Sequence, residues 1–176
     1  MSIAPCTWPK RLLLASFVCA LSLSPVQIQD ACAAAQKETS MPTEQLGPFP
    51  RGAENTAYAK YFIGTSYLQP LVQEGLPISN VTFEPACRNN WHIHHATRGG
   101  GQILLCTAGR GWYQEWGKEA RELKTGDTVY IPAGVKHWHG AAKDSWFVHI
   151  AIAVPGDNTS NEWLEPVTDE QYAKLP

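Results

Sequence analysis

Short runs of alternating apolar and polar residues, separated by turn residues, recur along the chain from Tyr58 onward. Such alternation places every second side chain on the same face and is typical of β-strands with one buried face. We expect strands at residues 61–71, 78–84, 101–107, 111–116, 128–131 and 146–154. Because no crossover helices separate these runs, a parallel α/β layout is excluded. The pattern predicts an all-β domain, a small barrel or jelly roll.

Glycine-containing segments predict the turns between these strands. Residues 108–111 (AGRG) lie between two strand-like runs and predict a hairpin, and residues 124–127 (KTGD) predict another turn. Residues 168–174 (TDEQYAK) form the only helix-like stretch, so we expect a short C-terminal helix.

The first 35 residues have the features of a secretory signal peptide. Lys10 and Arg11 precede an apolar run at residues 12–23, and the small residues Ala33, Ala34 and Ala35 follow. The run is shorter than the roughly 20 residues that cross a bilayer, which favours a cleaved signal over a permanent anchor. We therefore expect a secreted or periplasmic protein, with an extended N-terminal arm at residues 36–57 and one domain at residues 58–176.

Composition and charge exclude several function classes. The chain has 14 Lys and Arg against 16 Asp and Glu, a formal net charge of -2, so nothing favours nucleic-acid binding. We expect no membrane association after signal removal. Only Cys87 and Cys106 lie beyond the signal, and each is either a small buried apolar residue or half of a single disulfide.

All six histidines lie between residues 92 and 149. On a strand, alternate side chains share a face, so His92 pairs with His94 and His137 pairs with His139. Two such pairs, each beside a turn, point to a metal site. His95 falls on the opposite face and is expected at the rim.

These segments resemble the two motifs of the cupin family. Residues 91–94 (WHIH), followed by Gln102 and Gly109, are similar to the first motif, and residues 126–137 (GDTVYIPAGVKH) carry the Gly, Pro, Gly and His spacing of the second. The first motif departs from the common pattern. Gln102 stands where a glutamate is usual, and a glycine-rich insertion separates it from His94.

More narrowly, residues 80–154 resemble the small bacterial cupins with hydroxynitrile lyase activity, whose wider relatives are described as carboxymuconolactone-decarboxylase-like. The resemblance implies a β-barrel that holds one divalent metal ion, commonly manganese, with Fe, Zn, Co and Ni left open. By motif, the implied ligands are His92, His94, Gln102 and His137. Three neutral imidazoles and a neutral amide leave the positive charge of the metal uncompensated, which favours Lewis-acid chemistry.

Two further histidines are candidates for catalysis. His139 shares the strand face of the ligand His137, and this placement suits a general base. His149 lies on the alternating strand at residues 146–154, either facing the same cavity or bonded in the core. Residues matching both positions contribute to the active site in the lyase-like cupins.

The preferred interpretation is a metal-dependent lyase acting on a small hydroxylated or carbonyl compound, most concretely a cyanohydrin. Two alternatives stay open, an iron-dependent dioxygenase and a non-enzymatic cupin that binds a metal and a small ligand. A small-molecule substrate is the expected partner. Because cupins commonly dimerise through their sheets, we also expect a homo-oligomer, a dimer or tetramer, in which the N-terminal arm could exchange onto a neighbouring barrel.

Overall fold

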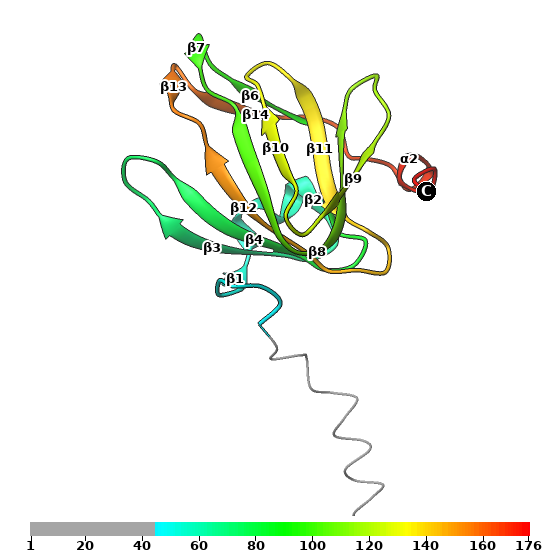
Figure 1. Cartoon of the computed structure of the whole chain (residues 1–176). Helices are drawn as coiled ribbons and strands as arrows, with labels where there is room; N and C mark the ends of the chain where they lie inside the picture. Colours follow the sequence, from blue (N-terminus) through cyan, green and yellow to red (C-terminus); the bar gives the residue numbers. More distant parts are fainter. Residues whose placement is uncertain (1–44) are drawn as a thin grey trace, which may run out of the picture. The chain divides into compact units, whose positions relative to one another are not determined.

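The computed structural model describes residues 45–176, in which antiparallel strands curl into a barrel (Figure 1). Twelve strands form one sheet along the path β1-β3-β4-β12-β8-β11-β5-β2, with β6, β9, β10 and β14 paired beside it, while β7 and β13 form a separate ribbon. The elements are β1 (Ala53–Glu54), η1 (Thr56–Tyr61), β2 (Phe62–Ile63), β3 (Ser66–Val72), β4 (Ile78–Phe83), β5 (Arg88–Asn89), β6 (His92–His95), β7 (Arg98–Gly99), β8 (Gln102–Glu115), β9 (Arg121–Lys124), β10 (Thr128–Ile131), β11 (Lys136–Ala141), β12 (Phe147–Ala153), β13 (Gly156–Asp157), β14 (Ser160–Trp163) and α2 (Asp169–Tyr172). The predicted all-β barrel with a short C-terminal helix is confirmed.

The prediction of a hairpin at residues 108–111 is wrong. The two expected strands are one long strand, β8, which runs along one wall of the barrel, bends, and continues along another (Figure 1). Its first half pairs with β10 and its second half with β9 and β11, rather than with each other. Gly109 adopts a φ of 71°, and a Cβ there would lie 1.8 Å from the Trp146 carbonyl oxygen. The glycine therefore marks a corner of the barrel.

Other predicted elements are in place. Residues 128–131 and 78–83 are strands, and α2 begins after Thr168, whose side chain forms a capping box with Gln171. The single run expected at residues 61–71 is instead two strands, β2 and β3. The chain turns between them at Gly64, whose φ is 85°. Cys87 and Cys106 are buried free thiols, so the alternative of a disulfide between them is not realised.

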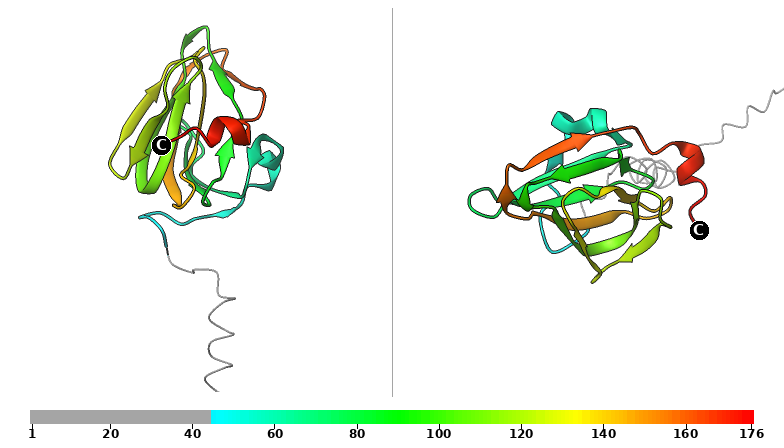
Figure 2. Two further views of the ribbon diagram at one scale, coloured as in Figure 1. Left: turned by 90° about the vertical axis from the view of Figure 1, so that its right-hand side faces the viewer. Right: turned by 90° about the horizontal axis from the view of Figure 1, so that it is seen from above.

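Alternation along β11 separates two cores. His137 and His139 face the barrel interior, where the side chains of Phe83, Leu104 and Phe147 are fully buried. Trp138, between the two histidines, faces outward and packs in a second cluster with Trp91, Trp112, Val167 and Tyr172. Val167 and Tyr172 come from the C-terminal segment, whose helix α2 lies on the outside of the sheet (Figure 2).

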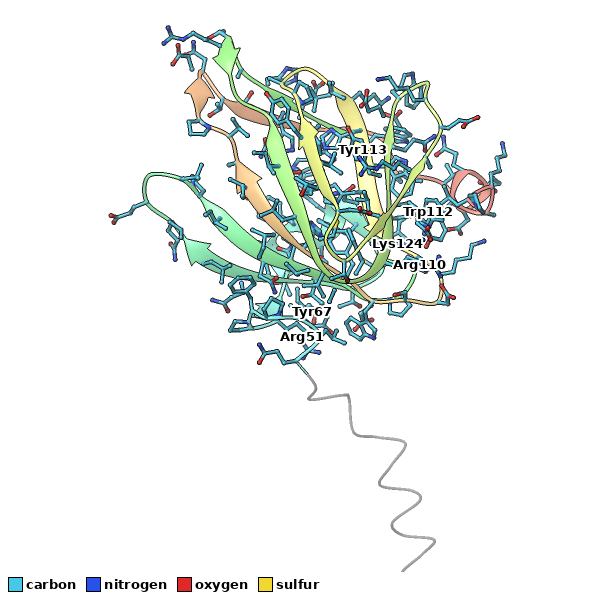
Figure 3. The ribbon with its side chains drawn as sticks, in the orientation of Figure 1. Arg51, Tyr67, Arg110, Trp112, Tyr113 and Lys124 are labelled. Atoms are coloured by element: carbon cyan, nitrogen blue, oxygen red, sulfur yellow. The ribbon has the colours of Figure 1, made fainter. Side chains whose placement is uncertain are left out.

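The described part of the N-terminal arm lies against its own barrel. Ala53 and Glu54 pair with Leu68 and Tyr67 of β3. The guanidinium of Arg51 lies 4.2 Å from the centre of the Tyr67 ring (Figure 3). The predicted signal peptide, at residues 1–35, lies outside the described residues. Across residues 45–176, no helix combines the length and the apolar character needed to cross a membrane.

Candidate metal centre

Two adjacent strands bring three histidines together. His92 and His94 lie on β6, and His137 of β11 is the direct cross-strand partner of His92. One nitrogen atom from each ring lies within 4.8 Å of the others. This spacing suits three ligands of a single ion, and it is the juxtaposition that the two His-x-His pairs predicted.

Backbone carbonyls orient two of these rings. Nδ1 of His92 donates to the carbonyl oxygen of Asn90 over 3.0 Å, and Nδ1 of His137 donates to that of Val135 over 2.9 Å. A neutral imidazole that donates through Nδ1 keeps its lone pair on Nε2. Nε2 of His137 is buried and, among residues 45–176, has no hydrogen-bond partner. Such an orientation is the one that metal-ligating histidines adopt.

A neighbouring strand orients the third ring. Nδ1 of His94 lies 2.7 Å from Oδ1 of Asn161 on β14, which is the cross-strand partner of His94. Nε2 of His94 is buried without a partner in the described chain. Trp163, two residues further along β14, stacks on His92 with ring centres 4.8 Å apart. This strand was not predicted from the sequence, although Asn161 and Trp163 alternate as residues of one face do.

Gln102 is placed where it could act as a fourth metal ligand. It is the first residue of β8, and its side chain lines the same cavity as His92 and His94. Within residues 45–176, its Oε1 atom is buried and accepts no hydrogen bond. An amide oxygen beside three imidazoles is a donor set that divalent manganese, iron or zinc accepts. By contrast, His95 points to the other face and pairs with Glu162 at the surface, as expected for a rim histidine.

Burial keeps the ligand rings neutral. It lowers the pKa of His137 to about 4 and that of His92 well below its usual value, and the neighbouring imidazoles lower the His92 value further. Burial also lowers the pKa of His94, although its hydrogen bond to Asn161 acts in the opposite direction. Neutral imidazole is the form that binds a metal, so these rings can bind one at neutral pH without first losing a proton.

Two more histidines lie beside this cluster. His139 of β11 and His149 of β12 are buried, with ring centres 4.9 Å apart, and both line the cavity that His92 and His94 line. Neither ring nitrogen of His149 has a hydrogen-bond partner in the described chain. Burial lowers the pKa of His149 to about 3. Nε2 of His139 is 3.0 Å from the side-chain amide nitrogen of Asn89, a residue that the sequence analysis did not single out.

The cavity itself has a volume of about 240 Å³. Its polar lining comes from His92, His94, His139, His149, Gln102, Asn89 and Asn161. The rest of the lining is largely apolar and aromatic, with contributions from Tyr58, Phe62, Leu68, Val81, Phe83 and Trp163. A small molecule that carries both polar and apolar groups fits this lining.

Comparison with known proteins identifies the family. A family model described as a cupin domain matches residues 79–152. Over 120 residues the chain is 42% identical to (R)-mandelonitrile lyase of Granulicella tundricola, in an alignment that covers 66% of this chain and 88% of the relative. The chain belongs to the cupin family. This cupin therefore has a lyase among its relatives.

A solved structure supports the same assignment. A cupin-like protein from Thermotoga maritima is 41% identical to this cupin, with a TM-score of 0.63. The match covers 72% of this chain and 95% of that protein. The alignment therefore spans nearly the whole of the solved barrel.

Proposed function

We propose that this cupin is a divalent-metal-dependent hydroxynitrile lyase that cleaves a small aromatic cyanohydrin to an aldehyde and hydrogen cyanide. One observation carries the proposal. Two of three convergent imidazoles, those of His92 and His94, line a cavity together with two further buried histidines, in a chain 42% identical to an (R)-mandelonitrile lyase. The expectation of manganese follows from the resemblance to lyase-like cupins, and the donor set is compatible with it.

His92, His94, His137 and Gln102 are the residues that would hold the metal. None of them carries a negative charge at neutral pH, so the full positive charge of a bound ion is available to stabilise an anion that develops during cleavage. The hydrogen bonds of the three Nδ1 atoms keep the rings oriented before any metal arrives.

We assign proton abstraction to His149. The sequence favoured His139 for this role, but the only lone pair of the neutral His139 ring accepts a hydrogen bond from Asn89, whose oxygen is held by the His139 backbone N–H. Among residues 45–176, nothing engages the lone pair of His149, and the ring stays neutral because burial lowers its pKa to about 3. Negative charge that develops on the substrate beside this ring raises its proton affinity during the reaction.

The proton that leaves the substrate hydroxyl returns to the leaving group through His149, so the reaction needs no other proton carrier. The hydroxyl proton moves to His149, the C–O bond becomes the aldehyde carbonyl, and the electron pair of the C–CN bond leaves with cyanide. Cyanide then takes the proton from protonated His149 and departs as hydrogen cyanide. An N–H of His139 donates a hydrogen bond to the group on which charge collects.

The shape of the cavity supports an aromatic substrate. Phe62, Phe83 and Trp163 line the cavity, and Phe62 packs against both of the other rings. A phenyl ring of the substrate can pack against these rings, while its hydroxyl and nitrile groups meet the polar lining residues. The volume of about 240 Å³ suits a molecule of this size.

The test is product formation from (R)-mandelonitrile. The manganese-loaded protein is expected to release benzaldehyde and cyanide in equal amounts. His149→Phe keeps an aromatic ring beside Phe83 and Phe147 and should keep the metal, yet it should lose turnover by about 100-fold or more. His95→Phe, at an exposed site, is the matched control and should keep both.

Each alternative gives a different result. Oxygen consumption by the iron-loaded protein, with no cyanide release from any cyanohydrin, would replace the lyase with a dioxygenase. Tight binding of mandelonitrile without turnover would indicate a binding protein. Unchanged cyanide release by His149→Phe would remove that residue from the reaction.

A further inference from the structure

The side chain of Asn89 contacts both the backbone and the ring of His139. Its Oδ1 atom accepts the backbone N–H of His139 over 3.0 Å, and its Nδ2 atom lies 3.0 Å from Nε2 of the imidazole. The first bond fixes which end of the amide is the oxygen, because only an oxygen can accept from a backbone N–H. The amide nitrogen must then face the ring, and it can only donate.

This donor determines where the ring carries its proton. An amide N–H that points at Nε2 requires a lone pair on that atom, so the proton of the neutral imidazole resides on Nδ1. Nδ1 of His139 is buried, and within residues 45–176 it has no hydrogen-bond partner. The nitrogen left for a molecule bound in the cavity is therefore a donor.

We propose that Asn89 is a positioning residue that holds His139 in the Nδ1–H tautomer, so that the ring donates a hydrogen bond to the reacting group of the cyanohydrin. This role rests on the proposed function, whereas the tautomer itself does not depend on it. The tautomer gives the two cavity histidines different chemical roles. His149 accepts the proton, and His139 supplies an N–H to the developing anion.

The backbone around Asn89 holds the amide in reach of the ring. Asn89 is 2% exposed and lies on β5, whose residue Arg88 pairs with Gly140 of β11, next to His139. A Cβ at Gly140 would lie 2.6 Å from the Cβ of Arg88, so this close approach of the two strands requires glycine. Arg88 in turn bonds the carbonyl oxygen of Val167 and the carboxylate of Asp169. The C-terminal segment therefore anchors the strand that carries Asn89.

Replacing the amide with a carboxylate reverses the hydrogen bond. In Asn89→Asp, one oxygen can still accept the backbone N–H of His139, while the other can only accept from the ring. Nε2 must then be protonated. Asn89→Ala removes the donor without replacing it, which leaves both tautomers accessible. Asn80→Asp is the matched control, since Asn80 is also fully buried but bonds the carbonyl oxygen of Pro50 instead of a histidine.

The experiment reads the tautomer directly. Long-range ¹H–¹⁵N NMR correlation of the ring nitrogens is recorded on ¹⁵N-labelled, zinc-loaded protein at neutral pH, because zinc is diamagnetic. In the native protein and in Asn80→Asp, His139 should be protonated at Nδ1 and unprotonated at Nε2. Asn89→Asp should show a protonated Nε2, and Asn89→Ala a mixture of the two forms.

A second arm measures turnover and metal content of the manganese-loaded proteins. Asn89→Asp should keep about one metal ion per chain and lose kcat for (R)-mandelonitrile by about 100-fold, the scale for loss of a donor to a developing anion. If the native protein releases no cyanide but shows the Nδ1–H tautomer, the proposed function fails and the role of Asn89 in the tautomer stands. A native His139 protonated at Nε2 overturns the inference, even if the Asn89 variants do not fold. An unprotonated Nε2 in folded Asn89→Asp overturns it as well.

Discussion

His137 lies directly opposite His92 in the β11–β6 pair, with ring centres 4.1 Å apart. Both rings donate through Nδ1 to a backbone carbonyl located two residues before them in the chain. The backbone thus fixes ring orientation on each strand, and strand pairing fixes the distance between the rings. A metal site formed in this way depends on the register of two strands more than on any side-chain contact.

The first prediction concerns metal content. His92→Ala or His137→Ala should lower the bound metal from about one ion per chain to near zero, because each removes one of three convergent donors. His95→Ala is the control and should keep its metal, since that ring pairs with Glu162 at the surface. Metal analysis of the purified proteins measures this. Full occupancy in both ligand variants would contradict the ligand set.

The second prediction concerns the residue that orients His94. Asn161→Ala removes the acceptor for Nδ1 of His94 and should weaken metal affinity by about 10–100-fold. Glu162→Ala, one residue further along β14, changes only the surface pair with His95 and should leave affinity unchanged. Titration against a competing chelator gives both values. Equal affinities in the two variants would remove Asn161 from the metal site.

The third prediction concerns stability in acid. Burial lowers the pKa of His149 from its usual 6.5 to about 3, so between these values the unfolded chain binds a proton that the folded chain does not. Above pH 6.5, His149 is neutral in both states and the free energy of unfolding is at its full value. As the pH falls below 6.5, proton binding to the unfolded chain lowers that free energy. At pH 5 the loss from this residue amounts to about 2 kcal/mol of unfolding free energy.

The variant His149→Phe isolates that contribution. Urea unfolding of metal-free native and variant proteins at pH 7.5 and pH 5 gives the difference between them, and the other five histidines are present in both proteins. The native protein should lose about 2 kcal/mol more than the variant on acidification. Equal losses would show that His149 is not held neutral by burial.

The fourth prediction concerns the corner of β8. Gly109→Ala should cost at least about 3 kcal/mol of unfolding free energy, because its Cβ would collide with the Trp146 carbonyl oxygen. Gly117→Ala is the matched control. Gly117 has a similar φ of 76°, but no atom of residues 45–176 lies within 4 Å of the added Cβ, so the substitution should cost only about 1 kcal/mol. Denaturant unfolding compares the two, and equal costs would contradict the close packing at the corner.

The sequence predicted that the two histidines of each His-x-His pair would share one strand face, because this part of the geometry is local. Alternation on a strand places His92 beside His94 and His137 beside His139, whatever the rest of the fold does. The strand-like run at residues 128–131 and the helix-like stretch at residues 168–174 are also local signals, and both elements are present.

What the sequence did not predict depends on packing between distant segments. Gly109 has the local signature of a hairpin, and only the neighbouring carbonyl oxygen of Trp146 makes it the corner of a continuous strand. Asn161 gains its role from pairing with β6, and Asn89 gains its role from the approach of β5 to Gly140. Neither Asn161 nor Asn89 belongs to a sequence motif, so their roles could be recognised only from the fold.

The most direct test of the central claim is the rate of cyanide release from (R)-mandelonitrile before and after removal of the metal. The protein is assayed as purified, after exhaustive chelation, and after addition of one equivalent of manganese per chain. Turnover should disappear with the metal and return with manganese. It should not return in His137→Ala, which lacks a ligand. Equal rates with and without metal would contradict metal-dependent cyanohydrin cleavage at this site.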